Sequence, residues 1–314
     1  MQQPPTTQAI SSPPRLGAFR HMALRVPDIQ AAAHAFAPVV GAPAWHLREA
    51  PGWRSATTRG ATVGLELVEA APSALGGLAR YGLSHAVFDA PAAGMAGAGL
   101  SVHEPLAGYG FADTRAALRG LALAVQAAHA PRGTLLQTPH EPALPVQKLY
   151  HTGIVVTDRE AAIAEFSAFF GIGHFVRMEL HTGDGFAVSL HGQDIEHHAL
   201  TAFGRTGGFA CELMQPGAGD GLYQRFLAVH GEGPQHHFPS ILGAGELASA
   251  VPRLRACGFA VALDGVFDGL LRYLYLEHAD LPGFALELIV PLREDWWQSM
   301  GMSGDDAWAI GLDP

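Results

Sequence analysis

The sequence is poor in cysteine and in charged residues, and each shortage excludes a class of protein. The two cysteines in 314 residues, Cys211 and Cys257, are too few for a disulfide framework, and neither lies in the CxxC pair of a zinc knuckle. Only 15% of the residues are charged, and their formal net charge is −10. Such a chain offers no basic field to phosphates, so we expect neither nucleic acid nor a membrane surface as a partner.

Long apolar runs are also missing. No stretch approaches the roughly 20 apolar residues that a membrane-spanning helix needs, although 48% of the chain is hydrophobic. The start, MQQPPTTQAISSPPRLG, is polar and rich in proline and lacks the apolar core of a signal peptide. We therefore expect residues 1–18 to be a disordered or extended tail on a globular, cytoplasmic protein that binds a small-molecule substrate.

Histidine, by contrast, is abundant. The chain has 17 histidines, and several of them lie in strand-like apolar runs. Most could be surface or hydrogen-bonded side chains, but their number in a chain with few charges is the first indication of metal chemistry.

Four segments of the chain begin alike, each with a histidine at the head of an apolar, β-like run that leads through a turn into an alanine-rich helical stretch. They start at Phe19 (FRHMALRVPDIQAAAHAF), Leu83 (LSHAVFDAPAAGMAG), Leu149 (LYHTGIVVTDREAAIAEF) and Gln235 (QHHFPSILGAGELASAV). An internal repeat is a better guide to the fold than any single local pattern.

The third copy shows the repeat most clearly. Asp158 is a suitable N-cap for a helix with apolar residues at helical spacing, and Gly171 is a suitable end for it. Three strand-like runs separated by turn residues follow: Phe175–His181, Phe186–Leu190 and Phe209–Met214. The pattern predicts a βαβββ module.

The other copies fit the same module. In the fourth, we expect a helix near Glu246–Cys257, kinked or begun by Pro252, and strands near Phe259–Leu263, Leu271–Glu277 and Phe284–Val290. The first copy should end in the strand Thr62–Val68 and the second in Gly133–Thr138.

Two βαβββ modules can pair and curl an open sheet around a cup, so four modules predict an α+β fold with two such domains. We expect the domains at residues 19–138 and 148–292, joined by a linker at 139–147 (it includes PHEPALP) and followed by a C-terminal extension at 293–314. An ordinary α+β sandwich with chance resemblance among its strands is the alternative.

The C-terminal half carries the same two residue types at two matching places. The first strand of its two modules offers His151 and His237, and the last strand offers Glu212 (FACELMQP) and Glu287 (FALELIVP). If a pseudo-twofold axis relates the modules, these side chains converge in the cup. Two imidazoles and two carboxylates suit a divalent ion such as Zn, Ni, Co, Mn or Fe(II). Either glutamate alone could instead face solvent.

The N-terminal half offers His21, Glu66 and His85 at corresponding places, with Gln137 near the fourth. These residues could bind a second metal, or this half could be a scaffold that also provides the surface of a homodimer. The sequence leaves both options open.

The C-terminal segments resemble a known family. LYHTGIVVTDREAAIAEF, CELMQPGAGDGLYQRFLAVHGEGPQHHF and PGFALELIVP are similar to the vicinal-oxygen-chelate (glyoxalase-like) superfamily, and the middle run most resembles methylmalonyl-CoA epimerases. The resemblance covers residues 148–291 and, more weakly, 19–138. It implies that His151, Glu212, His237 and Glu287 bind the metal. His237 is preferred to His236 because it has the same offset from the following apolar run as His151.

The resemblance also implies a chemistry, namely abstraction of a proton next to a metal-chelated carbonyl, with Glu287 or Glu212 as the base. The expected enzyme is an isomerase, epimerase or lyase. An Fe(II)-dependent ring-cleaving dioxygenase that uses His151, His237 and Glu287 is the alternative, although Glu212 would occupy a position that such an enzyme needs. A non-catalytic binding protein is the third option. Tyr275 is a further candidate for the substrate pocket.

Overall fold

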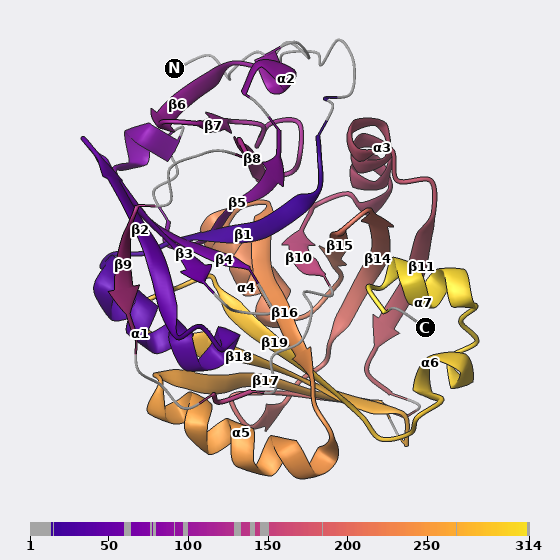
Figure 1. The fold of residues 1–314 in the computed structure, drawn as a ribbon. Coiled ribbons are helices and arrows are strands. Elements are labelled where there is room, and N and C mark those ends of the chain that lie inside the picture. Colours follow the sequence, from indigo (N-terminus) through magenta and orange to yellow (C-terminus); the bar gives the residue numbers. More distant parts are fainter. Residues whose placement is uncertain are drawn as a thin grey trace.

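The computed structural model describes residues 14, 16–59, 64–75, 77, 80–90, 92–96, 100–128, 133–138, 142–144, 151–183, 185–267 and 269–312. Their strands form two sheets, one in each half of the chain. In Figure 1 the N-terminal strands (indigo and magenta) lie toward the upper left, and the C-terminal strands (pink to yellow) lie toward the lower right.

The first sheet has the strand order β6-β7-β8-β5-β1-β4-β3-β2-β9. Its strands are β1 (Phe19–Arg25), β2 (Ala44–Ala50), β3 (Trp53–Arg59), β4 (Leu65–Ala70), β5 (Gly82–Asp89), β6 (Val102–Leu106), β7 (Tyr109–Ala112), β8 (Ala122–Gln126) and β9 (Thr134–Gln137). The first strand of each module pairs parallel with its last, β1 with β4 and β5 with β8, and the two modules meet where β1 pairs antiparallel with β5.

The second sheet has the order β11-β14-β15-β10-β16-β19-β18-β17-β12-β13. Its strands are β10 (Thr152–Val155), β11 (Phe175–His181), β12 (Phe186–Leu190), β13 (Gln193–Asp194), β14 (His198–Thr206), β15 (Phe209–Pro216), β16 (Gly233–Ile241), β17 (Phe259–Phe267), β18 (Leu271–His278) and β19 (Ala285–Pro291). The same pattern recurs at its centre, because β10 pairs parallel with β15, β16 pairs parallel with β19, and β10 meets β16 antiparallel.

Three of the four main helices follow the histidine-headed strands as the repeats predict, and the helix at Leu222–His230 was not predicted. The main helices are α1 (Ile29–Val40), α3 (Arg159–Phe170), α4 (Leu222–His230) and α5 (Ala244–Ala256), and shorter ones are η1 (Pro72–Leu75), α2 (Ala92–Ala96), α6 (Trp296–Ser299) and α7 (Gly304–Ala309). The Asp158 carboxylate accepts a hydrogen bond from the N–H of Ala161, and Gly171 ends α3 in the left-handed conformation with φ 70°. Pro252 lies inside α5, so of its two predicted roles, a kink or the start of the helix, it does not have the second.

Two of the predicted strands pair in unexpected places. Residues Phe186–Leu190 form β12, but this strand pairs with β17 at the far edge of the sheet, and the predicted position inside the third module is filled by β14. The ring of Phe186 stacks on that of Phe267, with 4.3 Å between centroids. This cross-strand aromatic contact accompanies the β12–β17 pairing and lies outside the repeat pattern.

The second module also ends earlier than predicted. Its last strand is β8, and the predicted strand Gly133–Thr138 corresponds to β9, which pairs with β2 at the edge of the first sheet. The run ALAVQ of β8 is short and rich in alanine, which is a weak strand pattern. The first module ends in β4, close to the prediction, although residues 62–63 lie outside the described part.

Helices of one half pack on the sheet of the other. Phe36 of α1 contacts Phe259 of β17, and Phe19 of β1 contacts Phe209 of β15, with ring centroids 5.5 Å and 5.4 Å apart. A hydrophobic core that runs through both halves contains all four rings, with Phe19 at its partly buried margin. Burying such a side chain contributes about 2–3 kcal/mol, so the two halves stabilise each other.

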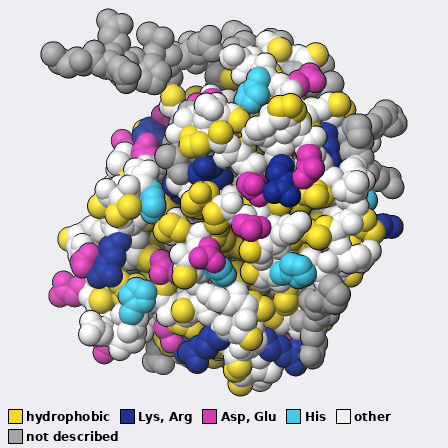
Figure 2. Space-filling model, turned by 90° about the vertical axis from the view of Figure 1, so that its left-hand side faces the viewer, with side chains coloured by type: hydrophobic (Ala, Val, Ile, Leu, Met, Phe, Trp, Pro, Cys, Tyr) yellow, Lys and Arg dark blue, Asp and Glu magenta, His cyan; other side chains and the backbone are white. Residues whose placement is uncertain are grey.

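Of the predicted linker, only residues 142–144 lie within the described part, and the predicted domain limits stay a prediction. No helix that the structure describes is long and apolar enough to cross a membrane. On the face in Figure 2, Lys and Arg side chains are interspersed with Asp and Glu, and no patch of one sign gathers there.

Candidate metal centre

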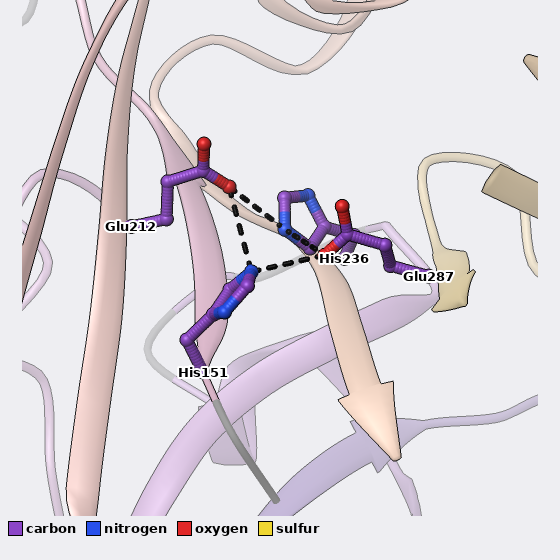
Figure 3. A group of neighbouring side chains, drawn as sticks. All are labelled: His151, Glu212, His236 and Glu287. Atoms are coloured by element: carbon purple, nitrogen blue, oxygen red, sulfur yellow. Dashed lines mark ion pairs between the residues drawn. The ribbon is translucent and has the colours of Figure 1, made fainter. Parts of the chain in front are cut away.

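Four buried side chains converge at the centre of the second sheet: His151, Glu212, His236 and Glu287 (Figure 3). Each offers a ligand atom, and these atoms all lie within 4.8 Å of one another. His151 Nε2 is 2.9 Å from Glu287 Oε2 and 3.5 Å from Glu212 Oε2. His236 Nε2 is 3.2 Å from Glu212 Oε2 and 3.4 Å from Glu287 Oε2. Within the described residues, no other group of His, Cys, Asp and Glu meets this criterion.

Strand register places three of these side chains on one face. Gly153 of β10 lies beside Glu212 of β15 in the parallel pair and opposite His236 of β16 in the antiparallel pair. Neighbours in register project from the same face of a sheet, as do residues two apart on one chain. Glu212 and His236 therefore share a face with Gly153, and Figure 3 shows His151 directed toward the same point.

The fourth side chain follows from the pairing of β16 with β19. His236 lies beside Ala285, and Glu287 is two residues further along β19, on the same face. Tyr275 of β18 lies opposite Glu287 and lines the cavity above the cluster, which agrees with its prediction as a pocket residue.

His237 was predicted as the second histidine, but the structure places His236 in the cluster instead. His237 lies beside Thr152 and Leu286, on the opposite face of the sheet, with its Nδ1 3.5 Å from Thr152 Oγ1. Burial, aided by the neighbouring histidines, lowers the pKa of His237 to about 3, so its ring is neutral.

The error has a structural cause. Between His237 and Ser240 the strand β16 advances three residues while β19 advances only two, from Leu286 to Leu288. The extra residue is a β-bulge, so an offset counted back from the following apolar run identifies the wrong member of the doublet.

The sequence does contain a feature that favours His236 over His237. A Cβ atom on Gly153 would lie 1.9 Å from Cε1 of His236 and 2.3 Å from its Nε2. Only glycine leaves space for this ring, and a glycine inside a strand often marks a close approach of this kind.

The buried charges of the cluster are energetically unfavourable unless a cation is present. Burial raises the pKa of Glu287, but His236, His151 and a hydrogen bond from Tyr275 outweigh burial and lower it. For His151, burial lowers the pKa, yet the carboxylates of Glu287 and Glu212 outweigh this effect and raise it. Two buried carboxylates without a cation beside them are costly to desolvate.

The residues fit a divalent metal ion. His236 Nε2 and Glu287 Oε2 are buried and accept or donate no hydrogen bond within the described structure, yet both point into the cluster. Two imidazole nitrogens and two carboxylate oxygens form a donor set that zinc and other first-row divalent ions accept.

The cluster lies at one side of a largely apolar cavity. Its walls come from the second sheet, through residues such as Leu180, Phe203 and Phe267, and from the C-terminal segment, through Trp296 and Ile310. This segment is held on the sheet where His174 Nε2 contacts Asp306 Oδ1 at 2.8 Å, so the cavity is covered by the residues predicted as a C-terminal extension.

The corresponding place in the N-terminal half is filled. The Tyr109 hydroxyl stands between His85 Nε2, at 2.6 Å, and Glu66 Oε2, at 2.8 Å, and His21 Nε2 lies 3.3 Å from the same carboxylate oxygen. Trp53 and Phe111 pack around this network. Gln137, expected near the fourth place, lies on the edge strand β9, whereas the last strand of its module is β8.

Comparison with known proteins agrees with this architecture. Residues 150–275 match the model of the Glyoxalase/Bleomycin resistance protein/Dioxygenase superfamily. This match agrees with the resemblance that the sequence predicted for residues 148–291. No protein with a curated description matches the sequence.

Among solved structures, a triple mutant of 4-hydroxymandelate synthase from Streptomyces coelicolor is similar over 88% of this chain and 93% of its own, with a TM-score of 0.60 and 15% identity. At this identity the likeness shows the fold alone: α+β, with two glyoxalase-like domains. Methylmalonyl-CoA epimerase from Mycobacterium tuberculosis matches 46% of this chain and 89% of its own, at 23% identity and a TM-score of 0.33, too low to support an argument.

Proposed function

We propose that the chain is a metal-dependent enzyme that removes a proton next to a carbonyl group of a small molecule, as isomerases, epimerases and lyases of this superfamily do. The observation that carries the proposal is the set of four buried ligand groups at the side of an apolar cavity. His151, His236, Glu212 and Glu287 would hold the ion. When bound, a divalent ion supplies Lewis acidity that polarises two neighbouring substrate oxygens.

The two glutamates differ in how firmly they are held. Glu287 contacts both histidines and also receives a hydrogen bond from Tyr275, whose hydroxyl lies 2.8 Å from that of Tyr223. Within the described residues, the ion pairs of Glu212 are those with the two histidines. We therefore assign Glu212 as the base that accepts the substrate proton and Glu287 as the fixed ligand.

The cavity supports this role for a carboxylate. Its walls are largely apolar, and a general base must lie within reach of the proton that it removes. No lysine or arginine is among the described residues that line the cavity, so no fixed cation competes for the Glu212 carboxylate.

An oxygen-dependent enzyme is the second candidate, and the looser hold on Glu212 favours it. If Glu212 left the ion, His151, His236 and Glu287 would remain as the two-histidine, one-carboxylate set of many iron(II) oxygenases. A non-catalytic binding protein is the third candidate.

One experiment separates the three. The metal-loaded protein is incubated in D₂O without oxygen, with 1-phenylpropane-1,2-dione as an enolisable probe, and NMR follows deuterium entering the methyl group. The proposal predicts exchange above the buffer rate that is lost in Glu212→Gln. Substrate turnover only with oxygen and iron would instead establish the second candidate, and binding without exchange or turnover the third.

A further inference from the structure

Two hydroxyl groups in the cavity have no hydrogen-bond partner within the described structure, Thr201 Oγ1 and the hydroxyl of Tyr273. Thr201 is 0% exposed and Tyr273 is 5% exposed. The other two tyrosines of the cavity, Tyr223 and Tyr275, are paired with each other at 2.8 Å. A buried hydroxyl without a partner is unfavourable, so two in one cavity indicate a ligand that supplies the missing acceptors or donors.

The two hydroxyls occupy equivalent places in the two modules. Phe203 of β14 lies opposite Glu212, and Tyr275 of β18 lies opposite Glu287. Thr201 and Tyr273 are each two residues before these partners and so lie on the same face, about 7 Å further along their strands. Each of the two glutamates thus has one free hydroxyl on the neighbouring strand, two residues from the position opposite it.

The backbone makes room for the ring that carries one of these hydroxyls. A Cβ atom on Gly265 would lie 2.1 Å from Cε1 of Tyr273 and 2.7 Å from its hydroxyl oxygen. Gly265 is the residue opposite Tyr273 in the β17–β18 pair, and Phe267 lies within 6.2 Å of the tyrosine ring, centroid to centroid. The ring is therefore fixed against β17, and its hydroxyl lines the cavity.

The charges of the site select against an anion. Glu212 and Glu287 together would neutralise a divalent ion, whereas a site with one carboxylate would keep a net positive charge. Since no lysine or arginine is among the described lining residues, a substrate carboxylate or phosphate would be buried without a counter-charge. The remaining walls are apolar.

We propose that the substrate is a neutral, mainly apolar molecule with two adjacent oxygens at one end and, further from the ion, a polar oxygen that hydrogen-bonds to Tyr273 or Thr201. This inference rests on the proposed metal site. It makes Tyr273 and Thr201 specificity-determining residues and excludes acyl-CoA and other anionic substrates.

The test compares three probes of similar size by isothermal titration calorimetry. They are 1-phenylpropane-1,2-dione, its 4-methoxyphenyl analogue, and phenylglyoxylate as the anionic analogue. Metal loading is measured first and separately, so a failure to bind metal contradicts the proposed function and not this inference. The two hydroxyls do not touch the ion, so the comparison of the two diones is repeated on metal-free protein.

We expect the methoxy analogue to bind about five- to tenfold more tightly than the parent dione, the gain of one hydrogen bond. Tyr273→Phe or Thr201→Val should abolish this gain without lowering the melting temperature, because each removes only an unpaired hydroxyl. Tyr81→Phe, which lies outside the cavity, should change neither the affinity gain nor the melting temperature.

Phenylglyoxylate should bind more weakly than the neutral dione. Equal or tighter binding of phenylglyoxylate would overturn the neutral-substrate part of the proposal. An unchanged methoxy gain in the Tyr273→Phe/Thr201→Val double variant would overturn the role of the hydroxyls, as would a lower melting temperature with no change in affinity, which would show that they are structural.

Discussion

Gly153 and His236 face each other across β10 and β16, so closely that a methyl group on Gly153 would stand 1.9 Å from Cε1 of the imidazole. Since His236 is buried, the ring cannot move aside without disturbing the cluster. We predict that Gly153→Ala lowers metal affinity at least about tenfold, because a ligand held out of position loses much of its binding. A Co(II) titration followed by visible absorption measures this loss.

Gly173 provides the matched control for that substitution. A Cβ atom there would meet nothing within 4 Å, so Gly173→Ala should leave the titration unchanged. Equal metal affinity of both alanine variants would contradict the proposed position of the His236 ring.

The histidine doublet allows a second prediction. His236→Ala should reduce metal affinity by at least about a hundredfold, more than the loss of an outer-shell partner, because a ligand atom is removed. His237→Gln should keep affinity within about tenfold, because its ring projects from the opposite face of the sheet. Circular dichroism confirms that each variant is folded, and the opposite ranking of the two affinities would support the original choice of His237.

The two glutamates should separate binding from catalysis. Glu212→Gln should keep most of the metal, because an amide oxygen can still coordinate, but lose about a hundredfold or more in deuterium exchange, because it cannot accept the proton. Glu287→Gln should mainly weaken metal binding, since it loses the carboxylate that His151 and Tyr275 hold in place. Undiminished exchange by Glu212→Gln would remove this residue as the base.

Acid stability tests the buried network of the N-terminal half. Burial lowers the pKa of His85 from 6.5 to about 4, so as the pH falls the unfolded chain takes up this proton first, and stability is lost between these two values. From pH 7 to pH 5, the protonation of this residue lowers the free energy of unfolding by about 2 kcal/mol. In urea unfolding at the two pH values, the drop in unfolding free energy should be smaller by about that amount in His85→Gln than in the wild type. An equal loss in both proteins would mean that His85 is protonated in the folded state.

Much of the fold could be predicted from the sequence because its strongest signals are local and repeated. A helix follows each histidine-headed strand, and Asp158 and Gly171 act as cap and terminator of α3 as predicted. What the local pattern does not contain is the partner of a strand. The β12 strand was found with its bounds, but its pairing with β17 depends on long-range contacts such as that between Phe186 and Phe267.

The candidate site could likewise be predicted only in part from the sequence. His151, Glu212 and Glu287 follow from strand alternation and from the repeat, and the structure brings all three together. His236 was missed because a β-bulge breaks the count of residues, and a bulge leaves no mark in hydrophobic periodicity. The free hydroxyls of Thr201 and Tyr273 could not be predicted from the sequence for another reason. A missing hydrogen-bond partner is visible only when all neighbours are placed.

Anomalous diffraction from crystals grown with Mn(II) or Co(II) would locate the ion that we expect four side chains to hold. We expect a single strong peak in the second sheet, about 2.0–2.3 Å from Nε2 of His151, Nε2 of His236 and one carboxylate oxygen each of Glu212 and Glu287. A peak next to His237, or peaks at surface residues with none among these four side chains, would contradict it.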